Sequence, residues 1–207
     1  MAFFKTPKDR TPKESEPRRS AIAVGLDYLH DVVYILAVVL VLFTFCVRVV
    51  IVSGSSMFST LADGDCLLLL NRPLCGELEQ GDIVVAAMDR FKSGEAIVKR
   101  VIATEGQTVD IDFREGIVYV DGAALDEDYT YSATRLAEGM ELPLVVSDVC
   151  LFLMGDNRMD SRDSRAPEIG LVDEREILGR AIFLAIPGTG RGEYTLEWDA
   201  GRIGGLN

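Results

Sequence analysis

The feature that most constrains the fold is a long apolar segment near the N-terminus, residues 29–52. A helix that crosses the hydrocarbon core of a membrane needs about 20 predominantly apolar residues. This segment reaches that length if Arg48, close to its end, extends its side chain to the lipid headgroups. We therefore expect a transmembrane helix over residues 29–52, with membrane lipid as a partner.

A cleaved signal peptide is the alternative interpretation, because basic residues precede the apolar segment. The apolar core of a signal peptide is usually about 7–15 residues long, and a small-x-small cleavage site follows it. This segment is longer, and no such site closes it cleanly. The small residues Ser53-Gly54-Ser55 keep the alternative open.

Charge is distributed unevenly around the segment. Residues 1–28 carry a net charge of +2, whereas the residues from Ser53 onward carry -14. By the positive-inside rule, the N-terminus lies in the cytoplasm and the larger part of the chain lies outside. A domain this acidic is unsuited to the phosphate backbone, which requires clustered lysine and arginine. We expect no nucleic-acid partner.

The remaining residues predict a mostly β domain. Residues 1–28 lack apolar periodicity and indicate a disordered cytoplasmic tail, and residues 191–207 are expected to form a C-terminal tail. Residues 53–190 contain short runs rich in Val, Ile, Leu and Phe, bounded by turn-forming residues. These runs are 66–70, 82–88, 95–103, 116–122, 149–155 and 180–186. Asp121-Gly122 predicts a hairpin turn, and Lys92-Ser93-Gly94 predicts another turn.

The cysteines do not follow a metal-binding pattern. Cys46 falls in the apolar segment, and Cys66, Cys75 and Cys150 are far apart in the sequence. Zinc sites use closely spaced cysteine or histidine pairs, which this chain lacks. A disulfide between two of the last three cysteines is compatible with an oxidising compartment. Buried free thiols are the alternative.

The choice of a catalytic base is narrow. The only histidine, His30, lies at the cytoplasmic end of the apolar segment, which excludes a Ser-His-Asp triad in the outer domain. That domain has two lysines, Lys92 in a polar turn and Lys99 in an apolar run. Burial lowers the pKa of a lysine, and a neutral amine can accept a proton from a serine hydroxyl. In the alternative, strand alternation turns Lys99 and Arg100 toward solvent.

Two polar stretches supply candidates for the rest of the site. Residues 53–59 form a serine-rich loop, in which we expect Met57 and Phe58 to dip into the bilayer surface. A flexible linker is the alternative. In residues 155–165, Asp163 and Arg165 are expected to pair and brace the site, and the Ser161 hydroxyl to orient the lysine amine. The alternative is a polar loop held by Asp–Arg pairs.

Four blocks in order resemble the bacterial type I signal peptidases, or leader peptidases, of the serine-lysine class. They are Gly54-Ser55-Ser56-Met57-Phe58-Ser59-Thr60-Leu61, Gly81-Asp82-Ile83-Val84, Lys99-Arg100-Val101-Ile102 and residues 155–165. The resemblance implies an antiparallel β-sheet catalytic domain after a transmembrane helix, in the plasma membrane. It further implies a serine endopeptidase that removes signal peptides from secreted preproteins without a cofactor or metal. Ser56 would be the nucleophile and Lys99 the general base.

The chain departs from the family pattern at several positions. Ser59 replaces the usual proline, and residues 103–107 differ from the usual Gly-Leu-Pro-Gly-Asp. Some members have a serine at the position of Gly54, and its hydroxyl helps to stabilise the oxyanion. Gly54 cannot do so, which leaves the Ser56 backbone N–H as the expected donor.

The resemblance also implies how substrate binds. A preprotein would add as a strand to an exposed sheet edge, which we assign to Ile97 and Val98. Three alternatives are an inactive anchored homologue that binds secretory chains, a self-cleaving repressor and a structural surface protein. The apolar segment and the acidic domain argue against a DNA-binding repressor, and the four ordered blocks argue against a purely structural protein.

Overall fold

The computed structural model describes residues 21–91 and 94–206. Residues 1–20 of the expected disordered tail and the residues Lys92 and Ser93 of an expected turn lie outside this range. The chain divides into two units, Met1–Val41 and Leu42–Asn207.

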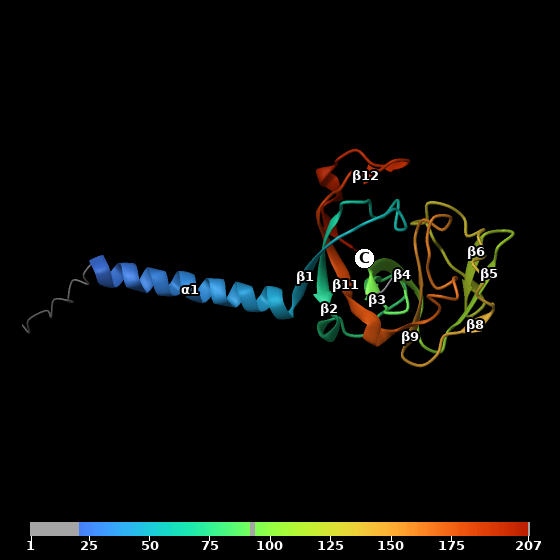
Figure 1. Cartoon of the computed structure of the whole chain (residues 1–207), viewed down its shortest axis with the longest axis horizontal. Helices are drawn as coiled ribbons and strands as arrows, with labels where there is room; N and C mark the ends of the chain where they lie inside the picture. The colour runs from blue at the N-terminus through green and yellow to red at the C-terminus, as the bar shows by residue number, and fades with distance from the viewer. Residues whose placement is uncertain (1–20, 92–93, 207) are drawn as a thin grey trace, which may run out of the picture. The chain divides into compact units, whose positions relative to one another are not determined.

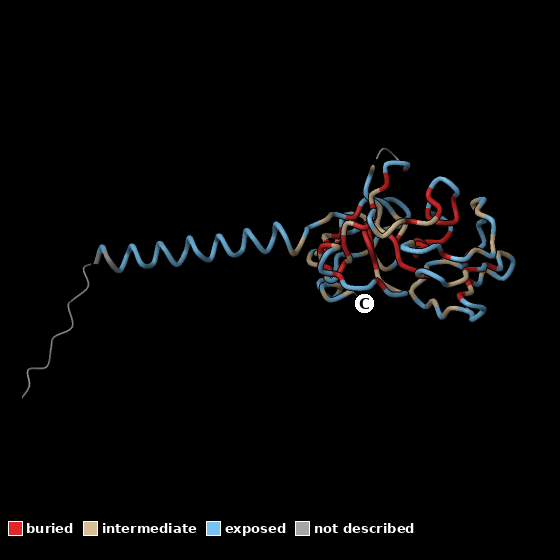
Figure 2. The backbone as a smooth tube through the Cα atoms, turned by 90° about the horizontal axis from the view of Figure 1, so that it is seen from below, coloured by how far each residue is buried: buried red, intermediate tan, exposed pale blue. Residues whose placement is uncertain are grey.

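The N-terminal helix α1 covers Ala21–Phe45, and its part Val24–Phe45 is long and apolar enough to cross a membrane. Its apolar side chains are largely exposed within the described chain (Figure 2). The expected helix over residues 29–52 is wrong at both ends. The helix begins inside the expected tail, and Val47–Ile51 forms strand β1. Strand β1 consists almost entirely of β-branched residues, which favour a strand over a helix.

The larger sheet is antiparallel throughout, with the strand order β1-β2-β11-β3-β4-β9-β10, and β14 pairs with β11 (Figure 1). Its strands after β1 are β2 (Cys66–Asn71), β3 (Ile83–Ala87), β4 (Ala96–Ala103), β9 (Cys150–Met154), β10 (Val172–Asp173), β11 (Ile177–Ile186) and β14 (Gly204–Gly205). Strands β3 and β4 are central, and their buried residues are Val, Ile and Ala, apart from Lys99 and Arg100 of β4.

A smaller antiparallel sheet has the order β7-β6-β5-β8, and β12 and β13 form a separate hairpin. Their bounds are β5 (Thr108–Asp112), β6 (Ile117–Val120), β7 (Ala123–Ala124), β8 (Leu144–Val145), β12 (Gly190–Arg191) and β13 (Tyr194–Thr195). The described residues also form the short 3₁₀ turns η1 (Arg72–Leu74), η3 (Glu174–Glu176) and η4 (Ala200–Arg202). Asp121 and Gly122, with φ of 52° and 78°, join β6 to β7, so the expected hairpin turn is confirmed.

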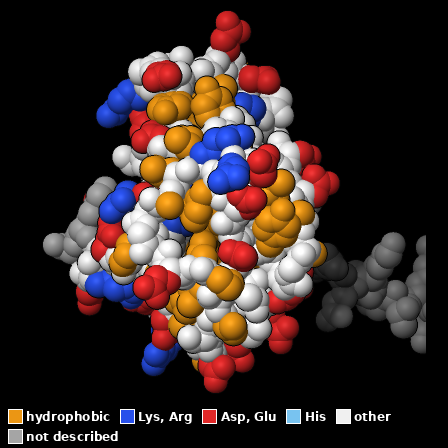
Figure 3. Space-filling model, turned by 90° about the vertical axis from the view of Figure 1, so that its right-hand side faces the viewer, with side chains coloured by type: hydrophobic (Ala, Val, Ile, Leu, Met, Phe, Trp, Pro, Cys, Tyr) orange, Lys and Arg blue, Asp and Glu red, His pale blue; other side chains and the backbone are white. Residues whose placement is uncertain are grey.

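Among the described residues, the buried hydrophobic side chains form three clusters. One fills the space around β3 and β9, and a second lies under the loop that follows β1, where it includes Met57 and Leu61. A third joins the two sheets, through residues such as Ile102 and Phe152. On the side of β5, β6 and β8, acidic, basic and hydrophobic side chains are intermixed at the surface (Figure 3). The expectation of a mainly β fold is confirmed.

The expected domain limits of residues 53 and 190 are too narrow. β1 is an edge strand of the large sheet, and beyond residue 190 the chain adds β13 and β14. Arg202 also pairs with Asp65, at 2.7 Å between Nη2 and Oδ2. The expected C-terminal tail is therefore part of the domain. All four cysteines are free thiols, which corresponds to the alternative without a disulfide.

Candidate active site

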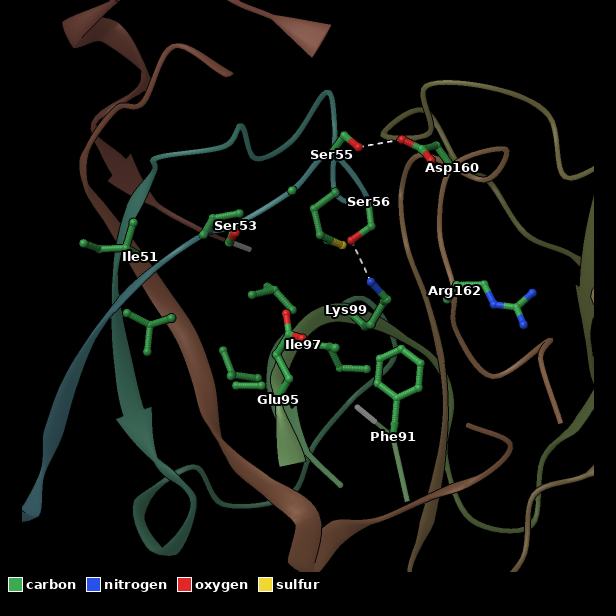
Figure 4. Close-up of a pocket in the computed structure, with 17 residues that line it drawn as sticks. Ile51, Ser53, Ser55, Ser56, Phe91, Glu95, Ile97, Lys99, Asp160 and Arg162 are labelled. Atoms are coloured by element: carbon green, nitrogen blue, oxygen red, sulfur yellow. Dashed lines mark hydrogen bonds between the residues drawn. The ribbon is translucent and has the colours of Figure 1, made fainter. Parts of the chain in front are cut away.

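Ser56 and Lys99 lie in direct contact, although 43 positions separate them in the sequence. Lys99 is in the middle of β4, and Ser56 is in the loop between β1 and β2. The Lys99 Nζ atom lies 2.6 Å from Ser56 Oγ (Figure 4). This distance allows direct proton transfer between a hydroxyl and an amine.

Lys99 and its neighbour Arg100 are both buried, with 3% and 4% of their surfaces exposed. The alternative in which both side chains face solvent is therefore wrong. Burial removes water from the ammonium and lowers the pKa of Lys99 to about 8, although the carboxylates of Asp163 and Asp156 oppose this shift. At pH 7 about a tenth of the amine is then neutral, far more than for an ordinary lysine.

The loop after β1 is held by the segment that follows β9. The Asn157 backbone N–H donates to the Ser56 carbonyl at 3.0 Å, and its side-chain amide donates to the Ser55 carbonyl at 3.2 Å. The Ser55 hydroxyl donates to Asp160 at 2.6 Å. The expectation that Met57 and Phe58 dip into the bilayer is wrong, since they are only 1% and 7% exposed and pack into the domain. These contacts fix the loop, so it is not a flexible linker.

Gly54 adopts φ of +101°, a conformation that glycine takes without the strain of a side chain. Its N–H donates to Asp63 Oδ1 at 2.8 Å. Among the described residues, no acceptor takes the backbone N–H of Ser56. That N–H can therefore donate to the negative oxygen that forms when the adjacent hydroxyl attacks a carbonyl group.

Asp163 and Arg165 form the expected buried pair, with 2.8 Å between Arg165 Nη2 and Asp163 Oδ2. The guanidinium holds the pKa of Asp163 below its usual range against the opposing effect of burial. The Ser161 hydroxyl donates to Asp163 Oδ2 at 2.8 Å and, within the described residues, makes no hydrogen bond to Lys99. The expected direct contact of Ser161 with the lysine amine is therefore wrong, and Ser161 is linked to the site through Asp163.

Sequence reasoning missed a second buried ion pair beside the first. Arg100 donates to both carboxylate oxygens of Asp156, at 2.9 and 2.7 Å, and Thr60 donates to the same carboxylate at 2.6 Å. The Tyr129 ring lies 4.0 Å from the Arg100 guanidinium carbon. This network ties the residue after the lysine to the loop of Ser56. The one sequence feature that could have predicted this ion pair is an arginine inside an apolar strand.

Sequence reasoning also missed the segment between β7 and β8. Glu127 pairs with Arg158, which is fully buried and also donates to Thr134 at 2.6 Å. The Tyr131 N–H donates to the Asp156 carbonyl at 3.0 Å, and its ring packs on Phe58 at 4.9 Å between centroids. The segment therefore holds the residues after β9 against the loop of Ser56. Its sequence lacks apolar periodicity, so no local sequence pattern predicts these contacts.

A cleft of about 260 Å³ leads to Ser56 and Lys99. The chain from Val50 to Met57 forms one wall, and Glu95 to Lys99 form the other, which places Ile97 and Val98 along the cleft. Strand β9 pairs with β4 only from Arg100 to Ala103. Strand β3 pairs with the earlier part of β4, from Ala96 to Arg100. Within the described residues, the part of β4 before Arg100 thus has an edge open to an added strand.

Among the described residues, no group of three or more His, Cys, Asp or Glu side chains is placed to hold a metal ion. The site consists of a hydroxyl, an amine, two buried ion pairs and a backbone N–H. These groups suffice for nucleophilic attack on a carbonyl.

Comparison with known proteins identifies a family and similar relatives. The family model described as "Signal peptidase, peptidase S26" matches residues 25–186. Signal peptidase I of Bacillus amyloliquefaciens is 37% identical over 66% of this chain and 72% of its own length. A probable signal peptidase I-1 of Synechocystis sp. is 35% identical over 69% of this chain and 72% of its own length. A solved signal peptidase I from Enterococcus faecalis V583 is 27% identical, with a TM-score of 0.42, over 50% of this chain and 96% of that chain.

Proposed function

The chain belongs to the signal peptidase family, peptidase S26, and from this premise we propose that it removes signal peptides from secretory preproteins with a catalytic dyad of Ser56 and Lys99. The observation that carries the proposal is the distance of 2.6 Å between Lys99 Nζ and Ser56 Oγ, with the lysine buried.

The reaction begins with neutral Lys99. Its amine accepts the proton of the Ser56 hydroxyl while the oxygen attacks the carbonyl carbon of the scissile bond. The Ser56 N–H donates to the negative oxygen of the tetrahedral intermediate, and the loss of one such donor costs about 10²–10³ in rate. The Lys99 ammonium then gives its proton to the departing amine, which leaves an acyl ester on Ser56.

Hydrolysis of the ester uses the same groups in reverse. Lys99, neutral again, accepts a proton from water, and the resulting hydroxide attacks the ester carbonyl. The proton returns to Ser56 Oγ as the bond to the acyl group breaks. Asp163, with Arg165 and Ser161 around it, supports this cycle as a fixed negative charge near the amine.

The open edge of β4 at Ile97 and Val98 receives the residues before the scissile bond as an added strand. The apolar walls of the cleft suit small side chains at the first and third of these residues. Helix α1 anchors the enzyme in the membrane, and the charge distribution puts the N-terminus in the cytoplasm and the catalytic domain outside.

The test is cleavage of a preprotein by the purified full chain in detergent or vesicles. Ser56→Ala and Lys99→Met should each reduce cleavage by about 10⁴-fold or more, since the nucleophile and base act as a unit. Ser59→Ala is the matched control, because it removes an exposed hydroxyl from the same loop. Cleavage that survives either dyad substitution would contradict the proposal.

An inactive homologue that only binds secretory chains is the second candidate. The departures at Ser59 and at residues 103–107 favour it. It predicts that the wild-type chain binds the preprotein without cutting it and that Ser56→Ala binds equally well. The same experiment separates the two functions.

A further inference from the structure

Glu138, in the segment between β7 and β8, is a buried carboxyl group near the dyad that the mechanism above does not use. It belongs to none of the four blocks that resemble the family. Its side chain is only 3% exposed. Its Oε1 accepts a hydrogen bond from Arg162 Nη1 at 3.0 Å, whereas Oε2 is buried without a hydrogen-bond partner among the described residues. A buried carboxyl oxygen without a partner is costly to a fold and calls for a reason.

The backbone on both sides of Glu138 is attached to the residues that brace the site. Arg165 Nη1 donates to the Leu136 carbonyl at 3.1 Å, and the Met140 N–H donates to the Arg165 carbonyl at 2.9 Å. The same Arg165 pairs with Asp163, whose charge acts on the catalytic amine. These bonds hold Glu138 beside the buried pair. Its partner Arg162 lines the main cleft (Figure 4).

The charges around Glu138 determine when its carboxyl loses a proton. Burial, and after it the negative charge of Asp163, raises the pKa of Glu138 above that of an ordinary glutamate, although Arg165 and Arg162 oppose this shift. The charge of Glu138 in turn raises the pKa of Lys99, against the larger effect of burial on the amine. An ionised Glu138 therefore holds the proton on Lys99, and a neutral Glu138 favours its release.

We propose that Glu138 is a positioning residue of the dyad and that the ionisation of its carboxyl sets how firmly Lys99 holds its proton. The proposal rests on the proposed function and adds a residue that controls the pH range of the reaction. Glu138 acts through its charge on the amine and touches neither the substrate nor the reacting atoms. As the pH rises, Glu138 loses its proton before Lys99 does. The charge that it gains makes the amine a stronger base but delays its conversion to the neutral form.

The test measures the pH dependence of kcat/KM on one preprotein, for the full chain and for Glu138→Gln. Glutamine has nearly the same shape and keeps an oxygen that can accept from Arg162, but it carries no charge. The midpoint of the rise in kcat/KM should fall by about half a pH unit, the size that one nearby charge produces at the effective dielectric constant of a protein. At pH 7, kcat/KM should therefore be about two- to threefold higher than in wild type.

Glu168→Gln is the matched control. Glu168 also pairs with Arg162, but its side chain is 41% exposed, so solvent screens its charge. This variant should keep the wild-type midpoint, which separates the buried charge from a loosened Arg162. Glu138→Asp keeps a charge at the buried place and should bring the midpoint back toward the wild-type value. Equal shifts in Glu138→Gln and Glu138→Asp would show a structural effect and overturn the proposal.

An NMR titration of the Lys99 side chain gives a second measurement, which requires no cleavage. The Lys99 midpoint should fall in Glu138→Gln by the same amount as the kinetic midpoint. In the wild-type chain, the Lys99 signal should also show a smaller step at the pH where Glu138 ionises, above the ordinary value of 4.5. Absence of this step overturns the proposal even if Glu138→Gln does not fold.

The two measurements also separate this proposal from the proposed function. An unchanged Lys99 midpoint in Glu138→Gln, with cleavage that still depends on Ser56 and Lys99, overturns the role of Glu138 alone. Failure of the wild-type chain to cut the preprotein overturns the proposed function, and the Lys99 midpoint then still decides whether Glu138 acts on the amine.

Discussion

The protonation of one amine controls the proposed reaction. Because the pKa of Lys99 is lowered to about 8, mainly by burial, the reactive neutral form increases as the pH rises toward that value. We expect kcat/KM to rise about tenfold per pH unit below pH 8 and to level off above it. Steady-state kinetics on one preprotein across this range checks the prediction. A profile that falls as the pH rises through 8 would show that a protonated lysine is required.

The sequence allowed the two reacting residues to be chosen, but not their surroundings. Lys99 was predicted as the base because the outer domain has no histidine, and the blocks that resemble the family predicted both Ser56 and Lys99. The Arg100–Asp156 pair and the contacts of Glu127, Tyr129 and Tyr131 depend on residues far apart in the sequence that meet only after folding. No local pattern encodes such pairs, so the sequence left them unassigned.

At the scale of elements, strand periodicity predicted β2, β3, β4, β6, β9 and β11, which are apolar runs with clear turn signals. β1 was assigned to the helix because a run of valines is apolar in either structure. Its pairing with β2, from Val47↔Leu70 to Ile51↔Cys66, shows that the segment is a strand. The short strands β5, β8, β10 and β12 to β14 were missed, since most have only two residues and depend on their partners.

The end of β9 packs directly on the loop of Ser56 at Gly155. A Cβ on this residue would lie 2.4 Å from the Ser56 carbonyl oxygen and 2.2 Å from Ser161 Oγ. We expect Gly155→Ala to displace Ser56 and to reduce kcat by about 100-fold or more, the scale of a 1 Å misplacement. Gly204→Ala is the control, because a Cβ there meets nothing within 4 Å. Equal kcat for Gly155→Ala and wild type would mean that the loop tolerates the shift.

At the scale of the whole molecule, the C-terminal residues stabilise the loop that carries the nucleophile. Arg202 donates to the fully buried Asp65 at 3.1 and 2.7 Å, and Asp65 also accepts the N–H groups of Ala62 and Gly188. Arg202→Ala leaves the buried carboxylate without its cation, a loss of about 3–5 kcal/mol in the free energy of unfolding. Thermal unfolding should show a clear decrease in Tm, whereas Arg175→Ala should leave Tm nearly unchanged. No decrease for Arg202→Ala would contradict this role.

The anchor and the catalytic domain are separable in the proposed function. We expect the full chain to remain with membranes in sodium carbonate, because Val24–Phe45 can span the hydrocarbon core. A chain that starts at Cys46 should be released and should still cleave a soluble peptide, since Ser56 and Lys99 lie in the second unit. Release of the full chain by carbonate would contradict a membrane span.

The most direct test of the account is the titration of Lys99 itself. The chain has five lysines, so a full-length sample labelled at lysine side chains gives few NMR signals, and Lys99→Met identifies the one of interest. The account predicts a midpoint of about 8 for Lys99. A midpoint near 10.5, the ordinary value for a lysine, would mean that the amine is protonated at neutral pH and cannot serve as the base for Ser56.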